Sequence, residues 1–159
     1  MAKKIGVAFM QKIIKRFEVP YLQVLDENGN FDSRLAPKLS NKQLLRLYEL
    51  FVLCRKFDDK ALSLQKQGRI STYASFRGQE AAQVGAAYAM KLADWFFPTY
   101  RESAAMITFG VPMRMLFQYF GGDERGSCFP KNLNMYPISI PVGTQGLHAV
   151  GVAMAGQIK

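Results

Sequence analysis

Apolar residues recur at helical spacing in several stretches, and the clearest begins near residue 40 of the 159-residue chain. Ser40 followed by Gln43 has the spacing of a capping box, which predicts a helix that begins after Ser40 and ends near Gly68. Its apolar residues near one face are Leu44, Leu47, Phe51, Cys54 and Leu62. The charged run over residues 55–60 is interpreted as a solvated face with weak local ion pairs.

Five further stretches are expected to be helical. Residues 3–17 predict a basic amphipathic helix, suited to a membrane surface or to packing against a partner subunit. Residues 79–92 are rich in alanine, and Gly85 is expected to be a point of close helix contact. Residues 101–109 and 113–120 predict two helices separated by Gly-Val-Pro, and residues 144–158 predict a last helix rich in small residues.

The remaining segments predict turns, loops and a small amount of strand. Residues 21–25 alternate as a strand would, and Asn28-Gly29 is a strong hairpin signal before a possible return strand at Phe31. Residues 70–76 are expected to be short and β-like or irregular. The stretch 121–137 predicts a long loop, either functional or disordered. We therefore divide the chain into an N-terminal extension, 1–39, and a main body, 40–159.

Composition places the chain among ordinary globular domains, with 49% hydrophobic and 21% charged residues. No apolar run approaches the roughly 20 residues that span a bilayer, so we predict a cytoplasmic protein, with a lysine-rich organelle presequence as the alternative. Cys54 is expected in the core and Cys128 in a loop, with no disulfide framework or metal site. The net charge of +9 suggests either a nucleic-acid partner or an acidic remainder elsewhere. The scattered positive charges favour the second interpretation.

Candidate chemistry is sparse. His148 is the only histidine; it has no triad or Cys-His partner and is interpreted as a packed or capping imidazole. The pair Asp123-Glu124 is interpreted as surface charge. Tyr100-Arg101 stands out because it follows Pro98 and precedes a predicted helix, whose N-terminus would offer backbone N–H groups. A guanidinium fork and a phenol beside such a terminus would suit a diphosphate.

Five short blocks occur in an order and at a spacing that resemble a known enzyme family. The blocks are residues 55–58, 67–70, 78–81, 98–102 and 142–153. The chain resembles the α subunits of the thiamine diphosphate-dependent 2-oxo acid dehydrogenases, the pyruvate dehydrogenase type in particular, over nearly all of residues 20–159. The resemblance implies an α/β fold, here an incomplete thiamine diphosphate-binding domain consisting mostly of its helical part, with a short N-terminal hairpin. It also implies an α2β2 tetramer with the cofactor between α and β subunits.

The resemblance assigns cofactor contacts to four residues. Tyr100 and Arg101 would bind the diphosphate, and Ile140 and Val142 would approach the aminopyrimidine ring, Val142 through its carbonyl. No catalytic residue is assigned; Ala74 takes a substrate-side position that is histidine in some relatives. The family's magnesium ligands would lie beyond Lys159, so no metal ligand is expected here and the isolated chain is expected to be inactive.

A potassium site is a further possibility that the resemblance raises. The positions that match its ligands are Ser139, Pro141, Thr144 and Gln145. Oxygen ligands at these positions would suit the ion, and a loop-to-helix cap is the alternative interpretation.

The implied activity is oxidative decarboxylation of pyruvate with acetyl transfer to lipoamide. The implied partners are the β subunit and the lipoyl acyltransferase component, with neither nucleic acid nor a membrane. Branched-chain 2-oxo acids or acetoin are alternative substrates. A truncated, non-catalytic paralogue that only binds a partner subunit is the alternative function, and a basic nucleic-acid binder is the more distant one.

Overall fold

The computed structural model describes residues 13–158, which fall into two compact units, one reaching to Lys38 and the other beginning at Leu39. In the first unit, the Asp26 carboxylate accepts hydrogen bonds from the backbone N–H groups of Asn28 (2.9 Å) and Asn30 (2.7 Å). Gly29 adopts a φ of 84° that favours glycine. The predicted turn is therefore present, but its strands are reduced to one antiparallel bridge between Leu25 and Phe31.

The predicted helix over residues 3–17 is not supported in the part of it that the structure describes. Residues 13–17 are not helical, and the rest of that stretch lies outside the described residues. The apolar side chains of this part are exposed, among them Ile14 and Phe17.

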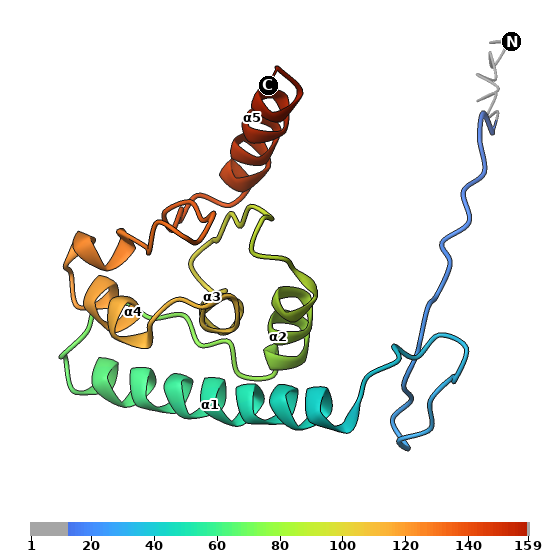
Figure 1. The fold of residues 1–159 in the computed structure, drawn as a ribbon, viewed down its shortest axis with the longest axis horizontal. Coiled ribbons are helices and arrows are strands. Elements are labelled where there is room, and N and C mark those ends of the chain that lie inside the picture. Colours follow the sequence, from blue (N-terminus) through green and yellow to red (C-terminus); the bar gives the residue numbers. More distant parts are fainter. Residues whose placement is uncertain (1–12, 159) are drawn as a thin grey trace, which may run out of the picture. The chain divides into compact units, whose positions relative to one another are not determined.

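Five α-helices and one short 3-10 helix make up the second unit (Figure 1). Their bounds are α1 Asn41–Lys66, α2 Glu80–Ala89, α3 Ser103–Phe109, α4 Met113–Phe120, η1 Glu124–Ser127 and α5 Thr144–Ile158. The predicted helices over 113–120 and 144–158 have the observed bounds. The helix predicted over 79–92 begins one residue too early and ends three residues too late, and the one predicted over 101–109 begins two residues too early. The long loop over 121–137 contains η1.

The predicted start of α1 is confirmed. The Ser40 hydroxyl accepts from the Gln43 N–H, and the Gln43 side chain accepts from the Ser40 N–H, so both halves of the capping box form. The helix ends at Lys66, and Gly68 then turns the chain with a φ of 69°.

Helix α1 supplies one side of the core, and α2 and α3 pack against it. Its buried residues are Leu50, Cys54, Phe57, Asp58 and Ala61. The interpretation of residues 55–60 as a solvated face is therefore wrong for Phe57 and Asp58. These two lie three and four residues after Cys54, so the helical repeat places them on its buried side.

Helix α4 and η1 form a tight pair. A Cβ added to Gly126 would lie 2.3 Å from the backbone nitrogen of Tyr119 and 2.4 Å from the Met115 carbonyl oxygen. Only a residue without a side chain fits between these backbones. Gly126 thereby fixes the loop that follows α4 against that helix.

Helix α5 is the opposite case, because none of its residues is buried. Its aromatic contact is His148, whose ring lies 5.0 Å from that of Tyr136, in keeping with the packed imidazole expected there. The apolar side chains exposed along α5 are Leu147, Val150, Met154 and Ile158.

The expected helix contact at Gly85 of α2 is absent, since a Cβ there would meet no atom within 4 Å.

Within the described residues, β structure is limited to two isolated bridges, the second a parallel one between Phe96 and Met135. The helical part of the predicted fold is present, and the α/β class is not confirmed in detail.

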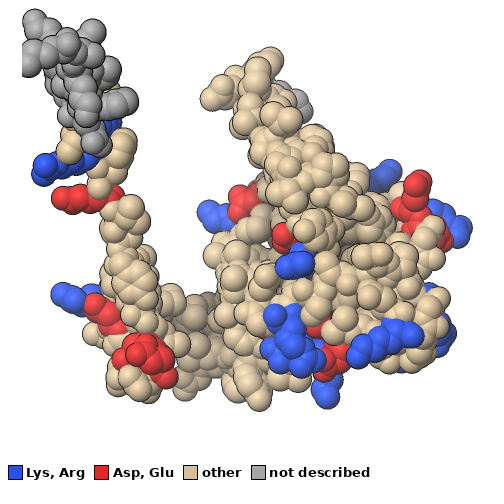
Figure 2. Space-filling model, turned by 180° about the vertical axis from the view of Figure 1, so that it is seen from behind, with Lys and Arg blue, Asp and Glu red and all other residues tan. Residues whose placement is uncertain are grey.

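No described helix is both long enough and apolar enough to cross a bilayer. Lys and Arg alternate with Asp and Glu over the face seen in Figure 2. Burial raises the pKa of the Cys54 thiol to about 11, whereas Cys128 is exposed; both cysteines are free.

Candidate functional site

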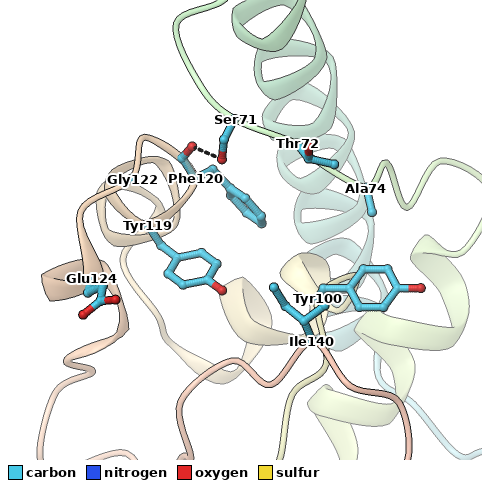
Figure 3. Close-up of a pocket in the computed structure, with 9 residues that line it drawn as sticks. All are labelled: Ser71, Thr72, Ala74, Tyr100, Tyr119, Phe120, Gly122, Glu124 and Ile140. Atoms are coloured by element: carbon cyan, nitrogen blue, oxygen red, sulfur yellow. Dashed lines mark hydrogen bonds between the residues drawn. The ribbon is translucent and has the colours of Figure 1, made fainter.

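A cavity of about 510 Å³ lies between the loop after α1, the loop before α3 and the end of α4 (Figure 3). Its lining residues are Ser71, Thr72, Ala74, Tyr100, Tyr119, Phe120, Gly122, Glu124 and Ile140. In Figure 3 the ring of Tyr119 points across the cavity toward Ile140 and Tyr100. The lining combines apolar surface with a few hydroxyls and one carboxylate, a composition typical of small-molecule sites.

Ile140 reaches this cavity through backbone pairing. The Phe96 N–H donates to the Asn134 carbonyl (2.8 Å), and the Tyr136 N–H donates to the Phe96 carbonyl (2.9 Å). Further along, the N–H of Ser139 donates to the carbonyl of Pro98 (3.3 Å). Residues 134–139 therefore run alongside residues 96–98, and Ile140 arrives beside Tyr100.

Residues 71–76 form one wall of the cavity, and the fully buried Asp58 of α1 fixes this segment through hydrogen bonds. Its carboxylate accepts from the Tyr73 hydroxyl (2.8 Å), the Ser75 hydroxyl (2.7 Å) and the Phe76 N–H (3.1 Å). Burial, followed by the hydrogen bond to Asp58, raises the pKa of the Tyr73 phenol. The phenol therefore keeps its proton and remains a donor. At the other end of the wall, both the N–H and the hydroxyl of Ser71 donate to the Phe120 carbonyl, each at 2.8 Å.

In the loop that carries Tyr100 and Arg101, backbone N–H groups are already bound by the side chain of Glu102. The Glu102 carboxylate accepts from the Thr99 N–H (2.9 Å), the Arg101 N–H (3.3 Å) and the Thr99 hydroxyl. Helix α3 begins at Ser103 and has only seven residues. The expected helix does follow Tyr100-Arg101, but it begins two residues later than predicted and has Glu102 at its N-cap position. A carboxylate at that position repels an anion, so the side chains of Tyr100 and Arg101 are the candidate anion ligands.

Two of the four predicted cofactor residues, Tyr100 and Ile140, line the cavity together with Ala74. Arg101 is exposed; its guanidinium carbon lies 5.8 Å from the Tyr100 ring centre, and it takes part in none of the ion pairs among residues 13–158. Val142 is 79% exposed and lies outside the cavity lining. The structure thus brings Tyr100, Ile140 and Ala74 together and leaves Val142 apart from them.

The four positions matched to a potassium site form a loop-to-helix cap. The Gln145 side chain donates to the Ser139 carbonyl (2.8 Å) and accepts from the Gly143 N–H (3.1 Å), and the Thr144 N–H faces the Pro141 carbonyl at 3.3 Å. These contacts support the capping interpretation, because the Ser139 oxygen already has a donor. Among the described residues, no group of three His, Cys, Asp or Glu side chains could hold a metal ion.

The interpretation of Asp123-Glu124 as surface charge missed the roles of both residues. The Asp123 carboxylate caps η1 by accepting from the Arg125 N–H (3.0 Å), and it also accepts from the Gln118 amide (2.8 Å). The Arg125 guanidinium lowers the pKa of Asp123. Glu124 instead lines the cavity. An Asp whose side chain accepts from the backbone N–H two residues on is a recognised turn pattern that could have marked this cap, whereas no local signal marks Glu124.

Comparison of the sequence with known protein families identifies the family of this chain. Residues 48–159 match the model of the dehydrogenase E1 component family. The chain belongs to this family. Its members are thiamine diphosphate-dependent enzymes, and the family resemblance seen in the sequence is confirmed. The matched residues include α2–α5 and every lining residue of the cavity.

Curated relatives carry names from two branches of the 2-oxo acid dehydrogenases. A pyruvate dehydrogenase E1 component subunit alpha from Acholeplasma laidlawii is 43% identical over 135 residues, covering 84% of this chain and 39% of the relative. Its counterpart from Staphylococcus aureus is 38% identical over 141 residues, covering 88% and 38%. A 3-methyl-2-oxobutanoate dehydrogenase subunit alpha from Mycobacterium tuberculosis is 42% identical over 132 residues, covering 83% and 36%. The chain thus spans about two fifths of the length of these relatives.

Proposed function

We propose that this chain forms part of the α subunit of a pyruvate dehydrogenase and that Tyr100, Arg101, Ile140 and Val142 contact thiamine diphosphate. One observation carries the site assignment. Ala74, Tyr100 and Ile140, which come from three separate segments, line a single cavity. The neighbouring Arg101 guanidinium forms no ion pair with the described carboxylates and is exposed.

The donors at this site fit an anionic cofactor. A guanidinium offers a planar fork of N–H donors that matches phosphate oxygens, and the Tyr100 hydroxyl adds a neutral donor. Ile140 gives the cavity an apolar surface for a flat ring. Thiamine diphosphate, when bound, supplies the carbanion-stabilising chemistry, and the protein contributes position and electrostatics. Magnesium would be held by residues outside this chain.

The reaction we propose is the oxidative decarboxylation of pyruvate, with acetyl transfer to lipoamide on the acyltransferase component. A β subunit would complete the site. The pyruvate dehydrogenase names of the Acholeplasma and Staphylococcus relatives support pyruvate, and the Mycobacterium relative keeps a branched-chain 2-oxo acid as the alternative. Substrate profiling of the complete α subunit with its β subunit tests the choice, and a preference for 3-methyl-2-oxobutanoate over pyruvate would overturn it.

Replacement of Arg101 tests the cofactor assignment. In the complete α subunit, Arg101→Ala should weaken thiamine diphosphate binding by about 1.5–3 kcal/mol, the range for hydrogen bonds to charged groups. Arg101→Lys should recover only part of this loss, because an ammonium cannot reproduce the fork. Calorimetric titration measures both. Arg114→Ala, an exposed arginine of α4, is the matched control and should bind normally. Unchanged affinity in both Arg101 variants would contradict the assignment.

A second candidate function is non-catalytic binding of a partner subunit. It is favoured by α5, which has no buried residue and exposes Leu147, Val150, Met154 and Ile158, since exposed apolar surface promotes association. Both candidates carry the same expectation for the 159-residue chain on its own. We expect it to be inactive on 2-oxo acids and to bind no cofactor with magnesium. Titration with thiamine diphosphate and magnesium measures cofactor binding by this chain, and a pull-down with the β subunit measures partner binding. Micromolar cofactor binding by a folded monomer would contradict this expectation.

A further inference from the structure

Gln83 of α2 is a buried amide that joins two points of the loop beside the cavity. Its side-chain nitrogen donates to the Arg101 carbonyl (3.1 Å), and its side-chain oxygen accepts from the Ala104 N–H (3.1 Å). One side chain thus spans the residues on either side of the start of α3. No motif in the sequence marks Gln83 for this role.

The contact to Ala104 replaces a missing helix cap. The first N–H groups of a helix have no partner within it and need one from outside. Glu102 occupies the N-cap position of α3 but makes no side-chain cap, because its carboxylate turns back to Thr99 and Arg101. Gln83 therefore caps α3 from a neighbouring helix, and this leaves Glu102 available to hold the preceding turn.

Together, Gln83 and Glu102 engage both backbone polar groups of Arg101. The Arg101 N–H is bound by Glu102 at 3.3 Å, and its carbonyl is bound by Gln83 at 3.1 Å. With the backbone fixed at both groups, the direction in which the Arg101 side chain leaves the loop is fixed as well. The guanidinium keeps its own rotamer freedom, but the backbone from which it extends is already ordered, which removes part of the entropic cost of binding an anion.

We propose that Gln83 is a positioning residue that holds the Tyr100–Arg101 loop in the conformation that receives an anionic cofactor group. The inference deepens the proposed function and rests on it for the identity of the ligand. Gln83 contacts no part of that ligand and acts through the Arg101 backbone. Its role is therefore separable from that of the guanidinium itself.

The test uses two substitutions that break the hydrogen bonds of Gln83 to Arg101 and Ala104 differently. A third bond, from its side-chain nitrogen to the Gln79 side chain (3.3 Å), stays within α2 and its N-cap. Gln83→Leu removes the bonds to both Arg101 and Ala104. Gln83→Glu keeps an acceptor for the Ala104 N–H but, when ionised, has no donor for the Arg101 carbonyl. Gln118→Leu is the control, since Gln118 donates to Asp123 in a different loop. In the 159-residue chain, amide exchange at Ala104 and tryptic cleavage after Arg101 are measured, with the Ser71 N–H, which donates to Phe120, as an internal measure of folding.

Each variant has its own expected pattern. Gln83→Leu should speed both Ala104 exchange and cleavage after Arg101 about fivefold to tenfold, the equivalent of one buried hydrogen bond. Gln83→Glu should speed only the cleavage at neutral pH, where the new carboxyl is ionised. Gln118→Leu should change neither. Unchanged Ala104 exchange and cleavage in Gln83→Leu, with Ser71 exchange intact, would overturn the proposal.

Cofactor binding by the complete α subunit with its β subunit separates this inference from the proposed function. Gln83→Leu should weaken thiamine diphosphate binding about threefold to tenfold, less than Arg101→Ala. If Arg101→Ala leaves binding unchanged, the cofactor assignment is wrong even where the exchange results hold. If Arg101→Ala weakens binding and Gln83→Leu does not, the positioning role is wrong while the proposed function stands.

Discussion

Replacing Asp58 with leucine should destabilise the second unit more than any other single change in the cavity walls. Three donors, from Tyr73, Ser75 and Phe76, converge on this fully buried carboxylate at 2.7–3.1 Å. Leucine has nearly the same shape but accepts nothing. Each donor left without a partner costs about 1–3 kcal/mol when buried.

The expected loss follows from how buried each donor is. Tyr73 and Phe76 are buried and Ser75 is only partly so, so we count two full penalties and a smaller third. The sum is about 2.5–7 kcal/mol, a large fraction of the 5–15 kcal/mol that typical domains possess. Asp58→Asn keeps one acceptor oxygen and should lose about 1–2 kcal/mol.

Urea unfolding followed by far-ultraviolet circular dichroism measures both losses from the midpoint and the slope. Tyr73→Phe in each background tests the coupling, because removing the hydroxyl should cost about 1 kcal/mol with Asp58 present and little or nothing with leucine there. A loss below 1 kcal/mol for Asp58→Leu, at unchanged slope, would refute the reasoning that this carboxylate holds the wall.

Other consequences can be tested independently. Gly126→Ala should destabilise by several kcal/mol, because a Cβ would collide with the α4 backbone at 2.3 Å; thermal unfolding measures it, and Gly122→Ala, at an open position with a φ of 92°, should cost less. The hydrogen bond from Arg55 lowers the pKa of Glu80, so the ionised Glu80 carboxylate stabilises the folded state above about pH 4.5, and this contribution is lost as the pH falls further. The destabilisation by Glu80→Gln in urea should therefore be larger at pH 7 than at pH 3, and an equal loss would contradict that assignment. The exposed apolar side chains of α5 should make the 159-residue chain self-associate, and Leu147→Lys should reduce this; light scattering that does not change would count against that surface.

Local signals predicted the helices well because the decisive contacts are local. The Ser40–Gln43 capping box lies within four residues, and it forms as expected. Gly110 takes the left-handed conformation that ends α3, and Pro112 begins α4, so the predicted split between these helices is confirmed. The capping box depends on hydrogen bonds between near neighbours, and the split depends on the conformational preferences of Gly110 and Pro112.

The candidate site was only partly predictable, because its walls meet through contacts that are distant in sequence. Asp58 was interpreted as a solvated charge, since nothing in its neighbourhood shows that donors 15–18 residues away would converge on it. Gln83 and Glu124 carry no local motif at all. Ile140 is named only through the family resemblance, whereas Tyr100 also stands out through the position of the Tyr100-Arg101 pair before a predicted helix. Their shared cavity depends on pairing between residues 96–98 and 134–139.

That pairing determines which changes in the loop after α4 can be tolerated. Because it is made by backbone groups, many side chains between residues 134 and 139 can vary without moving Ile140. The length of the segment is a different matter, since successive residues of an extended chain face opposite sides. Deleting one residue after Met135 would leave the bridge to Phe96 in place and present the wrong side of the chain to Tyr100. The count of residues in this segment is therefore constrained more strongly than their identity.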